Sequence, residues 1–113
     1  MPIIERQVGS VTVLELSGRL TMGAGSQELT EKLQDFIAGG HLALLLDCGQ
    51  VSRIDSQGIQ ALVRGFTSVE KQGGKLKLLN PSPKMREVLE VTHLLLIIES
   101  FDDEEVACRS FAE

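Results

Sequence analysis

A serine that directly follows an aspartate, at Asp55 and Ser56, carries the most distinctive chemistry in this sequence. The oxygens of both side chains can accept hydrogen bonds from the free N–H groups of a first helical turn, and Gly58 lets the backbone approach a neighbouring segment closely. A phosphate on Ser56 would be favoured by those N–H groups and by the helix dipole, yet it would add a charge of about −1.5 to −2 beside Asp55. Two interpretations follow. The pair is a helix cap, the simpler interpretation from local chemistry, or Ser56 is also a phosphorylation switch.

The elements that would position this pair are predicted from apolar patterns. Leu42 to Leu46 are apolar without interruption, which is typical of a strand buried on both faces. Turn-type residues follow Asp47, and from Ile59 to Val69 apolar residues recur at helical spacing. The sequence therefore predicts a strand, a polar turn and a helix that begins beside Asp55 and Ser56.

Nothing else in the sequence indicates catalysis or metal binding. His41 and His93 have no carboxylate or cysteine at ligand spacing, and Cys48 and Cys108 match no CxxC pattern. Two free thiols in a reducing compartment are the simplest interpretation of the cysteines. We expect no metal, no cofactor and no enzymatic activity.

A glycine-rich connection from Ser17 to Ser26 raises the possibility of a phosphate-binding loop. It lacks the Gly-Lys-Ser/Thr ending of a nucleotide-binding loop and the GxGxxG spacing of a dinucleotide fold. A flexible turn is the better interpretation, with Ser26 as the cap of a helix that Gly39 and Gly40 end.

Length and composition limit the function further. The 113 residues are expected to form a single domain, 1–113, and no apolar run is long enough to span a bilayer. The chain has a net charge of −5, no Trp and no Tyr, which argues against nucleic-acid binding. A protein partner is favoured, and one with a basic patch would suit the net charge. The absence of a secretory signal leads us to expect a cytoplasmic protein.

Other patterns complete the predicted element order. Two strands, Ile3 to Val8 and Val11 to Leu16, flank a Gly-Ser turn and form a hairpin. A strand is predicted from Lys75 to Leu79, with its two lysines either facing solvent or laying their stems over apolar neighbours. Ser82 is placed to cap the next helix, with Pro83 in its first turn.

The C-terminal part is expected to contain a last strand and a last helix. Leu94 to Ile98 is an apolar run that predicts the strand. Asp102 and Glu105 have capping-box spacing and would open the helix, with Val106, Ala107 and Phe111 on its inner side. The complete order predicts an α/β fold with about four helices and a mostly parallel sheet, to which the opening hairpin adds one antiparallel strand.

Beyond these patterns, the chain resembles the STAS domain family, and it looks most like the stand-alone bacterial anti-sigma factor antagonists. The segments that carry the resemblance, in chain order, are Val13–Leu20, Leu44–Asp47, Val51–Gly58, Gly73–Leu76 and Leu89–Leu94. The resemblance implies a STAS-like fold, Ser56 as phosphoacceptor, and a partner-binding surface formed by Thr21, Asp55, Ser56, Gln57 and Gly58. It implies as partner an anti-sigma factor with serine kinase activity, which the unphosphorylated antagonist binds and the phosphorylated form leaves.

Two residues depart from the family's usual pattern. Gln57 stands where a second Ser or Thr is common, and Thr21 stands where many antagonists have an acidic residue. An alternative role is therefore a STAS scaffold or an accessory subunit of a stress-signalling or transporter complex that works without phosphorylation. A small nucleotide-binding protein built on the turn at Gly23 to Gly25 is a third, weaker hypothesis.

Overall fold

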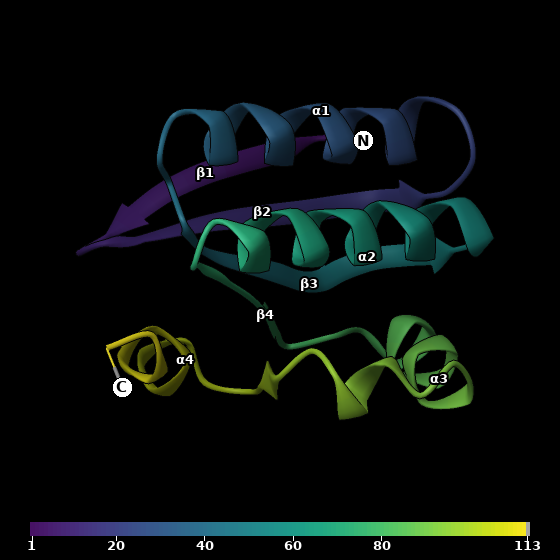
Figure 1. Cartoon of the computed structure of the whole chain (residues 1–113). Coiled ribbons are helices and arrows are strands. Elements are labelled where there is room, and N and C mark those ends of the chain that lie inside the picture. The colour runs from purple at the N-terminus through teal and green to yellow at the C-terminus, as the bar shows by residue number, and fades with distance from the viewer. Residues whose placement is uncertain (113) are drawn as a thin grey trace.

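The computed structural model describes residues 1–112 as one sheet with helices on both of its faces (Figure 1). The strands are β1 (Ile3–Val8), β2 (Val11–Leu20), β3 (Ala43–Ile54), β4 (Lys75–Leu79) and β5 (Ser100–Phe101). They lie in sequence order across the sheet, with β1 antiparallel to β2 and every later neighbour parallel. The predicted hairpin is confirmed: it turns at Gly9, whose φ of 62° is one that glycine adopts without strain.

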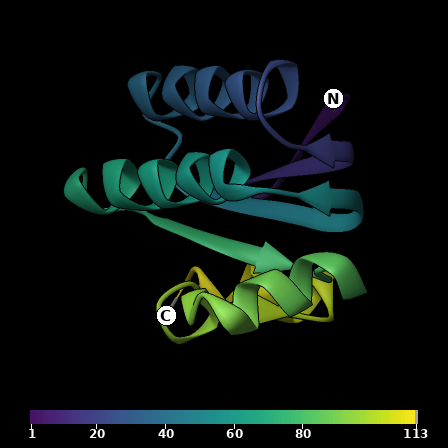
Figure 2. The ribbon, with the colours of Figure 1, turned by 90° about the vertical axis from the view of Figure 1, so that its right-hand side faces the viewer.

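Four helices accompany the strands. They are α1 (Ala24–Ala38), α2 (Ser56–Lys71), α3 (Pro83–Val91) and α4 (Glu104–Ser110), and a short 3₁₀ helix, η1 (Leu94–Leu96), follows α3. The first three follow one another down one side of the sheet in both ribbon views (Figures 1 and 2). The predicted α/β fold, with a mostly parallel sheet and one antiparallel N-terminal strand, is confirmed.

Side chains alternate across β3 and divide the core in two. Leu44 and Leu46 belong to the larger buried cluster, to which α1, α2 and α3 also contribute. Leu45 points to the other face and packs in a smaller cluster with Ala107 of α4. This two-sided burial explains why Leu42 to Leu46 shows no polar alternation.

The polar turn predicted after Asp47 does not exist. β3 continues without a break to Ile54, and its later residues Cys48 and Val51 are buried in the larger cluster. The extension pairs with a similarly long β2, and the hydroxyl of Ser82 donates to the carbonyl oxygen of Val51 at 2.6 Å. Neighbouring backbone therefore holds residues with turn propensity in a strand.

The glycine-rich connection is shorter than predicted, and Ser26 is not a cap. Strand β2 runs on to Leu20, and the N-cap of α1 is Gly23, which makes no side-chain capping bond. Ser26 lies inside the first helical turn, where its buried hydroxyl faces the carbonyl oxygen of Gly23 at 3.4 Å. Strand β2 extends to Leu20 because β3 continues beside it and pairs with it through backbone hydrogen bonds.

The last strand lies elsewhere than predicted. Residues Leu94–Leu96 form the 3₁₀ helix η1, and the strand that completes the sheet is the two-residue β5. Leu94 and Ile98 are buried four residues apart, whereas Leu96 between them is 83% exposed. That spacing is helical, so the five-residue apolar run does not have the pattern of a strand with both faces covered.

The last helix begins one residue later than the predicted capping box. Its N-cap is Asp103, which accepts from the N–H of Val106, while Asp102 instead pairs with Arg86 at 3.3 Å. Of the predicted inner residues, Ala107 is buried but Val106 is 46% exposed. Ala107 and Phe111, four residues apart, share one face of the helix and pack in the smaller cluster, so the adjacent Val106 points elsewhere.

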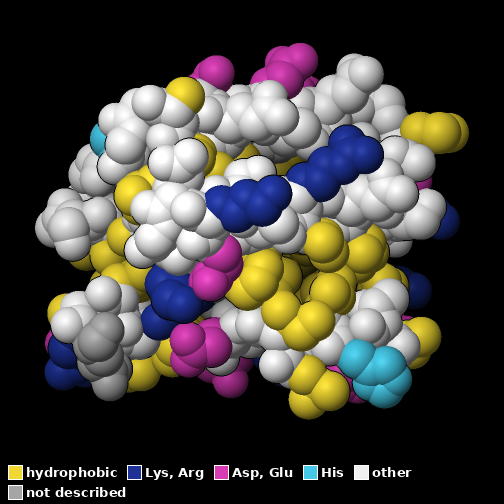
Figure 3. All heavy atoms as spheres, in the orientation of Figure 1, with side chains coloured by type: hydrophobic (Ala, Val, Ile, Leu, Met, Phe, Trp, Pro, Cys, Tyr) yellow, Lys and Arg dark blue, Asp and Glu magenta, His cyan; other side chains and the backbone are white. Residues whose placement is uncertain are grey.

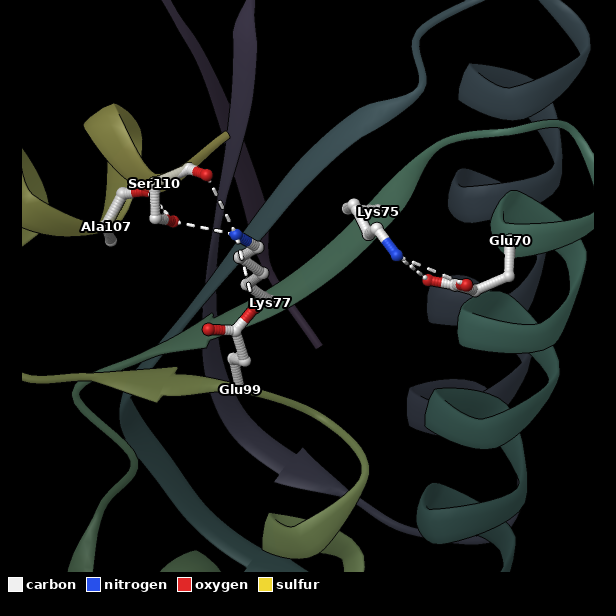
Figure 4. A network of polar contacts seen from close by, with 6 residues as sticks. All are labelled: Glu70, Lys75, Lys77, Glu99, Ala107 and Ser110. Carbon is white, nitrogen blue, oxygen red and sulfur yellow. Dashed lines mark hydrogen bonds and ion pairs between the residues drawn. The ribbon is translucent and has the colours of Figure 1, made fainter. Parts of the chain in front are cut away.

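Helix α4 is fastened to the sheet through a buried lysine (Figure 4). Lys77 of β4 is only 6% exposed, and its ammonium group donates to the hydroxyl and the carbonyl oxygen of Ser110. The same group lies 4.7 Å from the ring centre of Phe111 and 3.3 Å from a carboxylate oxygen of Glu99. Its partner in the alternation, Lys75, is exposed, so only one of the two lysines packs over apolar neighbours.

The predicted start of α3 is confirmed. Ser82 caps α3 by accepting from the N–H of Met85, and Pro83 occupies the first helical position. Helix α2 ends at Lys71, just before Gln72. Among residues 1–112, no helix combines the length and the apolar character that crossing a membrane requires.

Candidate functional site

Asp55 is the N-cap of α2, and its carboxylate holds three backbone N–H groups. One oxygen, Oδ1, accepts from Gln57 and from Gly58, at 3.0 Å each. The other oxygen, Oδ2, accepts from the N–H of Met22 at 2.9 Å. The backbone of Asp55 is extended, with φ −123° and ψ −171°, as is usual for a capping residue. A single side chain therefore fixes both the start of α2 and the loop beside it.

The loop between β2 and α1 is held against α2 by these contacts. Besides the Met22 bond, the N–H of Asp55 donates to the carbonyl oxygen of Leu20 at 3.4 Å. Thr21, which lies between the two bonded residues, is half-buried, and its carbonyl oxygen accepts from the N–H of Ser26 at 3.0 Å. The structure thus places Thr21 in the segment that adjoins Asp55.

These hydrogen bonds hold the pKa of Asp55 below its ordinary value. The largest contribution comes from the N–H of Met22, followed by that of Gly58. Each donor favours the ionised carboxylate, so the site carries a fixed negative charge at neutral pH.

Gly58 permits the close contact between α2 and the end of β2. A Cβ at this position would overlap the carbonyl oxygen of Leu20 and would lie 2.9 Å from Cγ1 of Ile54. Any larger side chain would therefore push the start of α2 away from the sheet. Gly58 thus sets the distance between the start of α2 and the end of β2.

Ser56 is the first residue of α2 and is exposed, as is Gln57. The first turn of α2 contains no acidic residue. The hydroxyl of Ser56 consequently lies at the positive end of a 16-residue helix, open to solvent and to an approaching protein.

A polar groove of about 280 Å³ runs between α1 and α2 next to this serine. Eight residues line it, most of them polar: Ser26, Gln27, Thr30, Glu31, Gln57, Gln60, Ala61 and Arg64. Gln57 is the one predicted site residue that reaches it. The described residues hold no group of three or more His, Cys, Asp or Glu side chains arranged to bind a metal ion.

The cysteines lie outside the site, and both are free, as predicted. Burial raises the pKa of the Cys48 thiol far above its ordinary value, and the nearby Asp47 adds to this effect. Cys108 is half-buried near α4, and burial raises the pKa of its thiol as well. Both thiols are therefore protonated and unreactive at neutral pH.

Two features of the site were missed by reasoning from the sequence. Met22 supplies an N–H to Asp55 and is 75% exposed beside it, but nothing in its sequence context signals either property. A second groove, of about 220 Å³, lies between the end of β3 and α3 and is lined by Arg53, Ile54, Lys84 and Val88. Arg53 and Lys84 are 31 positions apart in the sequence, so no local motif reveals this groove.

Comparisons with known proteins agree with this fold. A family model described as the STAS domain matches residues 3–107. A candidate anti-sigma factor antagonist of Thermotoga neapolitana, a TM1081 homologue, is 31% identical over 68 residues, which are 60% of this chain and 60% of that protein. The match therefore spans less than two thirds of that relative's length.

Solved structures show the same architecture. A candidate anti-sigma factor antagonist of Thermotoga maritima has a TM-score of 0.91 at 23% identity, covering 98% of this chain and 95% of the other. The Bacillus cell fate determinant SpoIIAA in its phosphorylated form has a TM-score of 0.75 at 24% identity, covering 96% of this chain and 99% of the other. Taken with the match over residues 3–107, the chain belongs to the STAS domain family.

Proposed function

We propose that this chain is an anti-sigma factor antagonist that works in the cytoplasm by partner switching. In this proposal it binds an anti-sigma factor with serine kinase activity, and phosphorylation of Ser56 controls the binding. Membership of the STAS family and the names of the relatives from two Thermotoga species support the antagonist role. That SpoIIAA has been solved in a phosphorylated form supports phosphorylation as a means of control within this fold.

The observation that carries the proposal is that Ser56 is exposed, while the backbone N–H groups beside it already donate to the carboxylate of Asp55. Asp55 accepts from the N–H groups of Gln57 and Gly58, which are donors that a phosphate at the start of α2 would otherwise use. A phosphate on Ser56 would meet these donors occupied and would stay at the surface as added negative charge next to a carboxylate. Phosphorylation would then change what can dock there while leaving the fold intact.

The proposed switch follows from this charge. Before phosphorylation, a partner can approach a neutral serine hydroxyl at the start of α2. After phosphorylation, docking would bring a dianionic group and Asp55 together at an interface that loses water. Like charges that are brought together at an interface cost several kcal/mol, which is enough to release a partner.

The first experiment asks whether Ser56 accepts a phosphate. The chain is incubated with ATP and each purified kinase-type anti-sigma factor of its source organism, and the products are mapped by mass spectrometry. We expect one phosphate, at Ser56, and none on a Ser56→Ala variant. Ser68→Ala is the matched control, because Ser68 is also an exposed serine of α2, and it should be phosphorylated like the unchanged chain. Phosphate at another residue, or none with any kinase, would refute the switch.

A second candidate function is a STAS scaffold or accessory subunit that binds without being phosphorylated. Thr21 and Gln57 favour it, because both lie beside Ser56 and both depart from the pattern of phosphorylated antagonists. This alternative predicts equal affinity of Ser56→Asp and Ser56→Ala variants for the partner, and it predicts large assemblies by light scattering. The antagonist proposal predicts weaker binding by Ser56→Asp and a discrete monomer or dimer.

A further inference from the structure

The lysines and arginines of the chain divide into those that make an ion pair and those that do not. In residues 1–112, ion pairs within 4.0 Å are made by Arg6, Lys75, Lys77, Arg86 and Arg109. Arg19, Arg53 and Lys84 make none, although all three are exposed. These three lie where β2 and β3 end and α3 begins, next to Ser56. Six of the eleven lysines and arginines make no ion pair within residues 1–112, and these three lie at one end of the sheet, while the other three are Lys32, Arg64 and Lys71.

Arg19 and Arg53 are direct neighbours in the sheet. Their Cα atoms are register partners in the parallel pair of β2 and β3. Like charges placed opposite each other on neighbouring strands destabilise a sheet. Within the described residues, no acidic side chain forms an ion pair with Arg19 or Arg53. The structure thus retains an uncompensated positive pair at the end of the sheet.

Lys84 extends this positive surface across a groove. The cavity of about 220 Å³ has Arg53 and Lys84 as its charged lining residues and Ile54 and Val88 as its apolar ones, and it has no acidic lining residue. Such a lining suits a side chain that ends in a carboxylate and has an aliphatic stem. Charge at the ends of the groove would bind the carboxylate, while the two aliphatic residues would cover the stem.

The local charge at this groove is opposite to the net charge of the chain. The net charge of −5 suggested a partner with a basic patch. A partner, however, responds to the charges of the surface on which it docks, which can differ in sign from the net charge of the chain. On the face that Figure 3 shows, Lys and Arg side chains lie across the middle of the molecule, with Asp and Glu side chains above and below them. The partner that fits the groove between β3 and α3 is therefore acidic at its point of contact.

We infer that the groove between β3 and α3 receives an Asp or Glu side chain of the anti-sigma factor, held by Arg53 and Lys84. The inference rests on the proposed function and adds the chemistry of the partner's contact surface. It also adds to the regulation, because Ser56 lies only three residues after Arg53. A phosphate on Ser56 would offset about two of the three positive charges of Arg19, Arg53 and Lys84 and would weaken the attraction for an acidic partner.

The experiment measures the affinity of the unphosphorylated chain for each purified kinase-type anti-sigma factor of the source organism by calorimetry, at low and at high salt. The test variant carries Arg53→Glu with Lys84→Glu, and a milder one carries Arg53→Gln with Lys84→Gln in case charge reversal disturbs folding. The control is Lys71→Glu, an exposed and unpaired lysine at the opposite end of α2, about 22 Å along the helix from Ser56. Circular dichroism confirms that each variant is folded.

We expect charge reversal to weaken binding about tenfold or more and neutralisation to weaken it less, while Lys71→Glu changes the dissociation constant by less than about twofold. Added salt should weaken binding by the unchanged chain more than binding by the reversed variant. Binding that is unaffected by either pair, or equally weakened by Lys71→Glu, would overturn the acidic-contact inference and leave the proposed function standing. Failure of the unchanged chain to bind any of these anti-sigma factors would overturn both.

Discussion

Helices α2 and α4 begin in the same way, yet only one of them presents a candidate switch. Each starts at an extended aspartate whose carboxylate accepts backbone N–H groups, Asp55 in α2 and Asp103 in α4. At the first helical position the two differ: α2 has the uncharged, exposed Ser56, and α4 has Glu104. The two helices therefore share the same kind of N-cap and differ in the residue that follows it.

Glu104 shows the fate of a negative charge at the start of a helix when an arginine is in reach. Its two carboxylate oxygens accept from the guanidinium group of Arg6, at 2.5 Å and 3.2 Å, and fasten α4 to β1. Arg6 in turn holds the pKa of Glu104 below its ordinary value. Because Glu104 is ionised and paired with Arg6, it holds α4 against β1. A serine that can gain a charge beside unpaired arginines can instead change a surface.

The third helical position gives the largest difference between the two starts. We predict that Gly58→Ala destabilises the protein by about 2–3 kcal/mol, because the added methyl group overlaps the backbone of Leu20 and overpacking of this kind costs 1–3 kcal/mol or more. The equivalent residue of α4 is Val106, which is 46% exposed, and Val106→Ala should change stability by less than about 0.5 kcal/mol. Urea unfolding of both variants measures this contrast. Equal losses would show that the close approach of α2 to β2 has been overstated.

The caps themselves should differ by a smaller amount. Asp103 accepts one N–H, and Asp103→Ala should cost about 0.5–1 kcal/mol, near the lower end of the range for capping residues. Asp55→Ala should cost more, because it also releases the N–H of Met22 and the loop before α1. Hydrogen exchange at Met22 reports this directly, since its amide should lose protection in Asp55→Ala and keep it in Asp103→Ala. Unchanged protection in both variants would contradict the role given to Asp55.

The smallest effect concerns pH. Asp55 and Glu104 both have a pKa below the ordinary value, so both are more easily ionised in the folded chain than in the unfolded chain. Their stabilising contributions are therefore complete above the unfolded pKa of about 4 and are lost as the pH falls through the lower folded values. NMR titration of the carboxyl groups should show that Arg6→Ala returns the pKa of Glu104 toward its ordinary value. The same substitution should leave the pKa of Asp55 low, because backbone N–H groups lower it; a rise at both residues would show that the two sites are coupled.

Much of the fold could be predicted because local patterns and tertiary structure agree. The apolar stripe from Ile59, the cap at Ser82 and the glycine turn at Gly9 each depend on a few adjacent residues. The failures came where a distant segment decides the outcome. Strand β3 continues past Asp47 because β2 pairs with it and Ser82 supports it, and neither contact is visible in the residues of β3.

The candidate site was predictable to the same extent. Asp55 as a cap and Gly58 as a point of close approach follow from residue type alone, although the backbone that Gly58 meets does not. Met22 and the groove between Arg53 and Lys84 depend on how the loop before α1 and helix α3 reach the end of β3. The net charge could not reveal this surface, because it sums over the chain, whereas Arg19, Arg53 and Lys84 are brought together by the fold.

The account depends most on the claim that phosphate on Ser56 changes the surface and not the fold. The measurement that tests it compares the chain before and after phosphorylation by its kinase, recording its affinity for that anti-sigma factor together with its thermal unfolding. We predict a loss of affinity of at least about tenfold with little change in the unfolding temperature, because Asp55 already holds the first-turn donors. Unchanged affinity, or a loss of affinity that is matched by unfolding of α2, would contradict the account.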